Sequence, residues 1–281
     1  MSDAINNDAT NLPVQTLIKR LHRHILAGRL TRGLMIALFV GGTMLFFSPL
    51  REHIAGSVGG NLGGGVMAGA LAWYTLMTTR TLRNHQNAMR AGQMLDAGRF
   101  DEAERVINEG LSRFALHRAP KLASLHHLAA MRYAQRRHSD AAELAMELLR
   151  HTRDPASRRN LNLMLADCAL ELNNLAIAQS ALASVGGAMP LRDTLKLMEL
   201  QVEYCARIGA WPQVIDQLPT KVELAELLAT EPAQRVQALM ALAALKQGRP
   251  DWAAWLRRRV ELLGDITSLL NRRPALSDLF A

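Results

Sequence analysis

The stretch AGQMLDAGRFDEA, residues 91–103, sets the pattern for most of this chain. Its first half has the composition of a helix end, and Gly98 suits the left-handed turn that closes many helices. Asp101 and Glu102 follow as the acidic residues that favour the first turn of a helix. The stretch therefore predicts two helices joined by a tight turn. From residue 80 onward the sequence is rich in Ala and Leu and has no alternating strand pattern, which indicates an all-α fold.

The same frame recurs four more times along the chain. A small residue on a first helix is followed, twelve positions later, by a small residue on a second helix in five pairs: Ala91 with Ala103, Ala130 with Ala142, Ala166 with Ala178, Val202 with Val214, and Ala241 with Ala253. The turn between them is expected at Gly98, Arg137, Asn173, Gly209 and Gly248. The second-helix positions lie 39, 36, 36 and 39 residues apart, and prolines mark the breaks between copies.

This pattern resembles the tetratricopeptide repeat family, in which a small residue on each first helix packs against an Ala on the second. The resemblance implies a TPR-like α-solenoid of about five helix pairs over residues 80–263, with the first helices lining a concave face. An irregular helical bundle is the alternative. Residues 264–281 are predicted to be a capping helix and a tail, whose Leu276, Leu279 and Phe280 are candidates to dock on the last repeat.

Two uncharged stretches, residues 33–50 and 54–79, precede the repeats. At about 1.5 Å per residue the two helices would be about 27 Å and nearly 40 Å long, against a hydrocarbon core of about 30 Å, and about 17–25 residues are enough for a spanning helix, so both are predicted to span. Only Arg51, Glu52 and His53 carry charge between them, so the sequence predicts an antiparallel transmembrane hairpin over residues 33–79. A cleaved signal peptide is disfavoured because 32 residues precede the first apolar stretch.

Basic residues flank the predicted hairpin on the side of both chain ends, whereas its tip has one Arg opposed by one Glu. The N-terminus and the repeat domain are therefore expected in the cytoplasm, with the chain integral to a bacterial-type inner membrane. Residues 1–32 form a basic leader in which apolar residues recur at helical spacing: Val14, Leu17, Ile18, Leu21, Ile25 and Leu26. This pattern suits an amphipathic helix on an anionic leaflet, and a merely solvated leader is the alternative.

Small residues are frequent in the second apolar stretch. Gly65, Ala68, Gly69 and Ala72 fall on one stripe of the predicted helix, which favours close contact with another helix and a possible homo-oligomer. The segment GGGVMA, residues 63–68, also fits a dinucleotide-binding pattern, but no strand precedes it and no acidic residue follows at the required distance. The dinucleotide interpretation is rejected.

Catalytic and cofactor motifs are not found, so the sequence predicts a non-enzymatic protein with no cofactor and no metal. Cys168 and Cys205 lack C-x-x-C spacing and are expected to be packed thiols of a reducing compartment. His126 and His127 are adjacent on a helix and point in different directions, which is poor geometry for one metal ion. Nucleic acid is an improbable partner, because the basic clusters have few aromatic residues beside them.

Two functional classes follow from this layout. The first is a membrane-anchored scaffold that binds a protein or peptide on the first helices of the middle repeats. The residues proposed to contact that partner are His127, Met131, Asn160, Leu163, Asp167, Lys196, Glu199, Glu203 and Arg207. A solvated charged face is the alternative for these charges. The second class is an accessory subunit of a biosynthetic enzyme pathway, because two N-terminal spans followed by residues 91–105 resemble, in layout, the HemY-type membrane proteins linked to haem synthesis.

Overall fold

The computed structural model describes residues 14–47, 56–113, 115–273 and 276–280, with side chains for 14–44, 64–113, 115–271, 273, 276–277 and 279–280. Throughout these ranges the chain is helical, with turns and no strand, which confirms the all-α prediction. The chain divides into two compact units, residues 1–151 and 152–281. Unit 1 contains α1 (Val14–Phe47), α3 (Gly56–Asp96), α4 (Phe100–Ser112), α5 (Ala119–Ala134) and α6 (His138–His151). Unit 2 contains α7 (Pro155–Glu171), α8 (Leu175–Ala183), α9 (Leu191–Arg207), α10 (Trp211–Ile215), α11 (Leu218–Glu226), α12 (Thr230–Lys246), α13 (Pro250–Leu263), α14 (Thr267–Arg272) and α15 (Ser277–Phe280).

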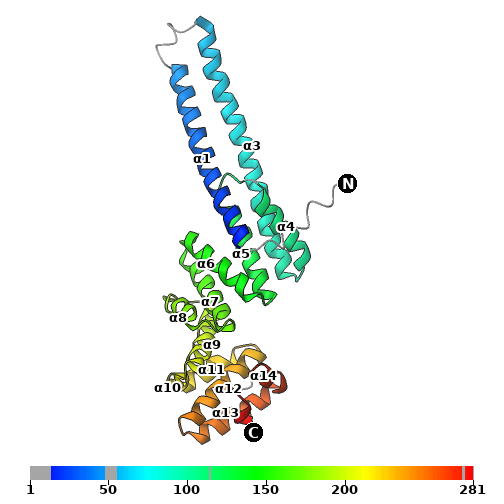
Figure 1. The fold of residues 1–281 in the computed structure, drawn as a ribbon, viewed down its shortest axis with the longest axis vertical. Helices are drawn as coiled ribbons and strands as arrows, with labels where there is room; N and C mark the ends of the chain where they lie inside the picture. The colour runs from blue at the N-terminus through cyan, green and yellow to red at the C-terminus, as the bar shows by residue number, and fades with distance from the viewer. Residues whose placement is uncertain (1–13, 48–55, 114, 274–275, 281) are drawn as a thin grey trace. The chain divides into compact units, whose positions relative to one another are not determined.

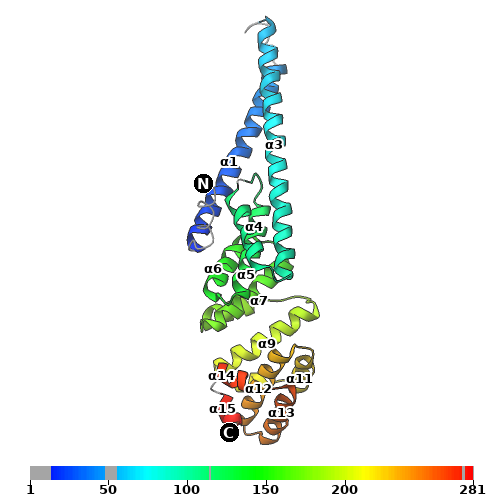
Figure 2. The ribbon, with the colours of Figure 1, turned by 90° about the vertical axis from the view of Figure 1, so that its right-hand side faces the viewer.

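Helices α1 and α3 form an antiparallel hairpin and lie side by side along its upper part (Figures 1 and 2). Both helices are longer than the predicted spans. α1 joins the leader to the first apolar stretch, and α3 joins the second apolar stretch to the first helix of the first repeat. The domain boundary expected at residue 80 therefore falls inside an unbroken helix. The predicted tip, residues 51–53, lies outside the described residues.

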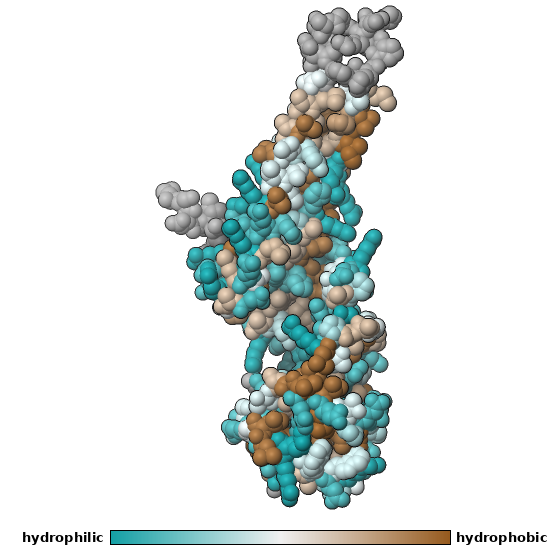
Figure 3. Space-filling model, turned by 180° about the vertical axis from the view of Figure 1, so that it is seen from behind, coloured by the Kyte–Doolittle hydropathy of each residue, from teal (hydrophilic) through white to brown (hydrophobic). Residues whose placement is uncertain are grey.

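One helix in the described part of the chain is long and apolar enough to cross a membrane, judged by length and composition: α1, between Val14 and Met44. The prediction of two spans is thus met by one helix only. The second predicted span, residues 54–79, contains many glycines, which add length to α3 but little hydropathy. Apolar side chains cover the upper, described part of the hairpin, as Figure 3 shows from behind.

The beginning of α1 differs from both interpretations of the leader. Val14, Leu17 and Leu21 are buried, and α1 packs against α3 and α6. The first part of the predicted stripe therefore faces protein instead of a lipid leaflet or solvent, whereas Leu26 is 59% exposed. Sequence periodicity identifies an apolar face, but periodicity is the same whichever apolar surface covers it. Residues 1–13 lie outside the described part.

Five turns of one backbone geometry connect the helices of five successive pairs. In each turn one residue has positive φ: Gly98 (72°), Arg136 (59°), Asn173 (55°), Gly209 (72°) and Gly248 (67°). The amide of the next residue donates to the carbonyl five positions earlier, over 2.7–2.9 Å in all five turns. This is the hydrogen bond of a Schellman turn. The second helix begins two residues after the positive-φ position each time, at Phe100, His138, Leu175, Trp211 and Pro250.

Four of the five predicted turn positions are confirmed, and the second is wrong by one residue. The left-handed residue there is Arg136, not Arg137. The small pair of this repeat is accordingly Ala129 with Ala141, both fully buried, in place of Ala130 with Ala142. The error has a simple cause: two alanines stand side by side on each helix, and no glycine marks the turn between them.

Arg136 gives a direct test of this register. A left-handed conformation costs about 1–2 kcal/mol for a residue with a Cβ, and glycine avoids that cost while losing more chain entropy on folding. Arg136→Gly is therefore expected to raise the free energy of unfolding by about 0.5–1 kcal/mol in denaturant titrations. Arg137→Gly is the matched control and should give no increase. A gain in the Arg137 variant alone would place the turn one residue later, as the sequence suggested.

The core of unit 2 includes the end of the chain. Leu276 and Leu279 are buried in one apolar cluster with side chains of α9, α12 and α13, and Phe280 packs against that cluster. The predicted docking of the tail on the last repeat is confirmed for these three residues.

Candidate functional site: a basic pocket at the foot of the hairpin

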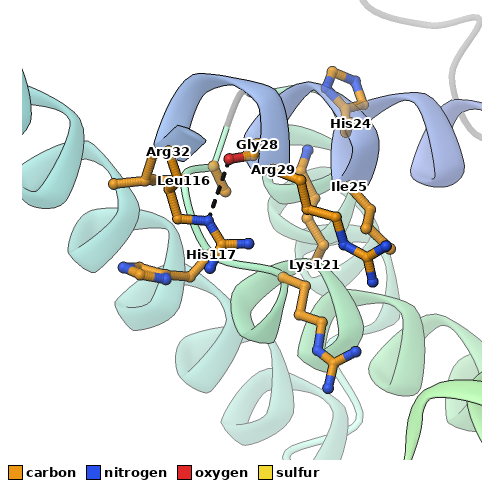
Figure 4. A pocket seen from close by; sticks show the side chains of 10 residues that line it. His24, Ile25, Gly28, Arg29, Arg32, Leu116, His117 and Lys121 are labelled. Atoms are coloured by element: carbon orange, nitrogen blue, oxygen red, sulfur yellow. Dashed lines mark hydrogen bonds between the residues drawn. The ribbon is translucent and has the colours of Figure 1, made fainter. Parts of the chain in front are cut away.

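A pocket in unit 1 lies between α1, the segment after α4, and the start of α5 (Figure 4). None of its lining residues is acidic, and all six of the polar side chains are basic: His24, Arg29, Arg32, His117, Arg118 and Lys121. A second, more open hollow shares Arg29, Arg32, His117 and Arg118. The two hollows therefore form one positively charged surface.

Gly28 allows α1 to approach the wall of this pocket. A Cβ on Gly28 would lie 3.2 Å from the carbonyl oxygen of Leu116 and 3.3 Å from that of Ala115, closer than side chains normally pack. The wall itself is fixed from the other side, since the amide of Leu116 donates to Thr81 Oγ1 of α3 over 3.0 Å. Arg32 Nε donates to the carbonyl of Gly28 over 3.2 Å, which orients its guanidinium along the pocket (Figure 4).

Lys121 is the buried cation of the site. Its ammonium donates to the carbonyl of Leu111 at the end of α4, and burial lowers its pKa to about 8. At pH 7 the larger fraction of Lys121 is still protonated. The pocket thus remains positive under ordinary conditions.

This arrangement is suited to holding an anion. The lining has guanidinium groups that can donate paired hydrogen bonds to phosphate or carboxylate oxygens. It also includes Arg118 and Ala119, at the start of the 16-residue helix α5, where the helix dipole favours negative charge. The lining contains no carboxylate and no thiol, and its cationic groups suit the recognition of negative charge. The sequence analysis assigned the basic residues before the hairpin, which include Arg29 and Arg32, only to membrane orientation. It did not predict that they lie beside residues 115–121.

The predicted partner residues are distributed over both units. In unit 1, Met131 is fully buried, and the ring of His127 covers Gly92, where an added Cβ would lie 2.8 Å from Cε1. In unit 2, Asn160 is exposed on α7, whereas Leu163 on the same helix is buried. Exposure therefore differs widely within the set.

The charged members of the set lie close together in unit 2, where they form ion pairs within the unit. Lys196 of α9 lies 2.8 Å from Asp167 of α7 and 3.2 Å from Glu199. Glu199 also pairs with Arg235 of α12, and Glu203 pairs with Arg207 over 2.7 Å. These groups form an ion-pair network inside the unit, in which Glu199 and Glu203 are buried. Neither acidic residue belongs to a solvated face.

Arg235 and Arg273 complete this network. Burial alone would lower the pKa of Arg235, but Glu199, Glu203 and Asp167 raise it, so the guanidinium stays charged. Arg273, from the C-terminal segment, lies 2.8 Å from Glu203 and 3.4 Å from Glu171. The network therefore ties α7, α9, α12 and the end of the chain together.

The small-residue stripe on α3 is uncovered in the structure. Gly65, Ala68, Gly69 and Ala72 are all exposed, and a Cβ added at Gly65 or Gly69 would meet nothing within 4 Å. Among the described residues nothing covers this stripe, so its contact with another helix stays a prediction.

The two cysteines are both free thiols. Cys168 is fully buried, as predicted, and burial raises its pKa to about 12. Cys205 is partly buried, and burial raises its pKa as well. Both shifts disfavour the reactive thiolate.

Comparison of the chain with protein-family models, curated proteins and solved structures finds no match.

Proposed function

We propose that this protein is a membrane-anchored, non-enzymatic TPR-like scaffold that binds a protein or peptide partner at the cytoplasmic face. The observation that carries the proposal is helix α3, which runs without interruption from the apolar hairpin into the first of the five turns. A rigid helix of 41 residues transmits position and orientation directly from the membrane to the repeat beside it. A flexible linker would not.

Membrane attachment is supported by apolar side chains that the described residues of unit 1 leave exposed. Leu34, Ile36 and Phe39 on α1, and Leu71 and Trp73 on α3, are each about half exposed or more. Contiguous apolar surface of this kind is unfavourable in water and favourable in lipid. The α1 side chains belong to the stretch that begins at residue 33, directly after the basic pocket.

The basic pocket fits this position. In the proposed arrangement Arg29, Arg32 and Arg118 lie at the depth of the lipid headgroups, and the pocket holds the phosphate of an acidic phospholipid. Positive charge on this side of the hairpin supports an orientation with the repeats and the N-terminus in the cytoplasm. In this proposal the same basic residues attract the acidic lipid and set the orientation of the hairpin.

Purification of the full chain in mild detergent, with identification of retained proteins, tests the scaffold function. We expect a stoichiometric partner. Asn160→Arg, on the exposed part of the proposed α7 surface, should weaken its capture several-fold, because a long cation would replace a small neutral group there. Gln179→Arg, exposed on the second helix α8, is the matched control and should capture normally.

Two outcomes contradict this proposal at different levels. If no protein is retained above the background of an unrelated membrane protein, the scaffold function is wrong. If Gln179→Arg weakens capture and Asn160→Arg does not, a partner exists but the binding face is on the second helices. A tetrapyrrole absorbance in the purified material would favour the accessory role in a biosynthetic pathway.

A further inference from the structure

Three side chains in unit 1 that are far apart in sequence converge on one point. His22 of α1 places Nε2 2.7 Å from Oε1 of Glu147 on α6, and His151, one turn further along α6, places its own Nε2 2.9 Å from the same oxygen. The potential ligand atoms of the three residues all lie within 4.8 Å of one another. We propose that His22, Glu147 and His151 form a binding site for a divalent transition-metal ion, with zinc as the best fit.

The donor set matches that ion. Zinc prefers imidazole nitrogen and carboxylate oxygen at about 2.0–2.2 Å, and three such protein ligands leave a fourth position for water or another group. Ligand atoms of a tetrahedral zinc site stand about 3.3 Å apart at these bond lengths. The observed separations of 2.7 and 2.9 Å on Glu147 are slightly shorter. Because the His22 side chain is half exposed, it can move outward by the small distance required.

The environment of Glu147 supports a charged ligand. The side chain is only 2% exposed, and a buried carboxylate needs compensating positive charge or hydrogen bonds. Oε1, which both histidines approach, is the oxygen that a metal ion would share with them.

Arg150 has two opposing effects on this site. It lies 3.1 Å from Oε2 of Glu147, so it holds the second carboxylate oxygen and leaves Oε1 directed at the histidines, as outer partners of metal ligands commonly do. Its positive charge also repels a cation. The Arg150 side chain is 72% exposed, however, and solvent screens that repulsion.

A metal ion here would link the start of α1 to α6 of the second repeat. Without it, α1 is attached at this point by one hydrogen bond, between His22 and Glu147, and by its buried side chains Val14, Leu17 and Leu21. A metal ion would join His22 of α1 to two ligands of α6, Glu147 and His151, and so fix the helix more firmly. Metal binding would therefore set how tightly the base of the hairpin is held to the repeats of unit 1.

The test is a titration of the full chain, purified in mild detergent without a polyhistidine tag and stripped with a chelator. We expect one Zn²⁺ per chain by calorimetry, and Co²⁺ should give the visible absorption of a tetrahedral nitrogen and oxygen site. His22→Ala and His151→Gln should each weaken Zn²⁺ binding at least tenfold. His85→Ala removes an exposed histidine of α3 outside the cluster and should leave binding unchanged.

Circular dichroism of each variant shows whether it is folded, and the half-exposed His22 is the substitution that folding tolerates best. The site is refuted if the wild-type chain binds no zinc, or if folded His22→Ala and His151→Gln bind it as tightly as the wild type. It is also refuted if His85→Ala weakens binding as much as they do. The three residues would then be a hydrogen-bonded cluster only.

Discussion

Replacement of Glu199 by alanine is expected to lower the free energy of unfolding of unit 2 by about 3 kcal/mol. Both carboxylate oxygens of Glu199 are engaged, one with Arg235 and the other with Lys196. Without Glu199 the largely buried guanidinium of Arg235 loses its direct partner. Lys196 keeps Asp167. Urea titration followed by circular dichroism, on the full chain in mild detergent, measures the loss.

Two further variants separate the burial of charge from a general effect of the substitution. Glu261→Ala breaks the exposed pair with Arg257 and should cost no more than about 0.5 kcal/mol. In Glu199→Met/Arg235→Met both buried charges are removed, so the loss should be smaller than in Glu199→Ala alone. If Glu199→Ala is as stable as Glu261→Ala, the network contributes nothing and this account of unit 2 is wrong.

The network also changes how partner binding can be tested. Charge reversal at Glu199 and Glu203 would remove the acidic partners of Arg235 and Arg207 and put new positive charges beside these arginines. Unit 2 would then lose stability whether or not it binds a partner. Lost capture in such a variant would report unfolding. Exposed positions such as Asn160 are therefore the informative ones.

The sequence was sufficient for the local structure and insufficient for the site. Turn positions at Gly98, Gly209 and Gly248 could be predicted because glycine is the residue that a left-handed turn favours. At Arg136 no residue type distinguishes the turn from its neighbour, and the predicted register was wrong by one. A turn position could thus be predicted where its residue type favours the left-handed conformation, and not elsewhere.

The sequence analysis missed contacts between residues that are far apart in the chain. His22 and Glu147 are 125 positions apart, and the only local sign of their cluster is the i, i+4 spacing of Glu147 and His151 on α6. The charges of α9 looked like a solvated face because their partners, Asp167, Arg235 and Arg273, belong to other elements. Amphipathic periodicity reports which side chains share a face but does not identify the covering surface.

The second large effect concerns the hairpin. Phe39→Asp together with Leu71→Asp places one carboxylate on the exposed apolar side of each helix, where Phe39 is 48% and Leu71 62% exposed. An acidic residue near the centre of a spanning helix costs about 3 kcal/mol of insertion free energy, so in the proposed two-helix anchor the pair should cost about 6 kcal/mol. We expect most of the variant to be absent from the bilayer.

The matched control is Leu82→Asp with Met89→Asp. These leucine and methionine side chains are 57% and 58% exposed on the lower part of α3, beyond the apolar stretch. A general penalty for acidic substitutions on exposed helix faces would appear in this variant too. A penalty that arises only in lipid would not appear in Leu82→Asp/Met89→Asp.

The fraction of each chain that stays in the membrane pellet after an alkaline carbonate wash tests the central claim most directly. Membrane anchoring predicts that the wild type and Leu82→Asp/Met89→Asp stay in the pellet, whereas Phe39→Asp/Leu71→Asp is lost from it almost completely. A wild-type chain that washes into the supernatant would contradict anchoring, and so would equal retention of all three chains.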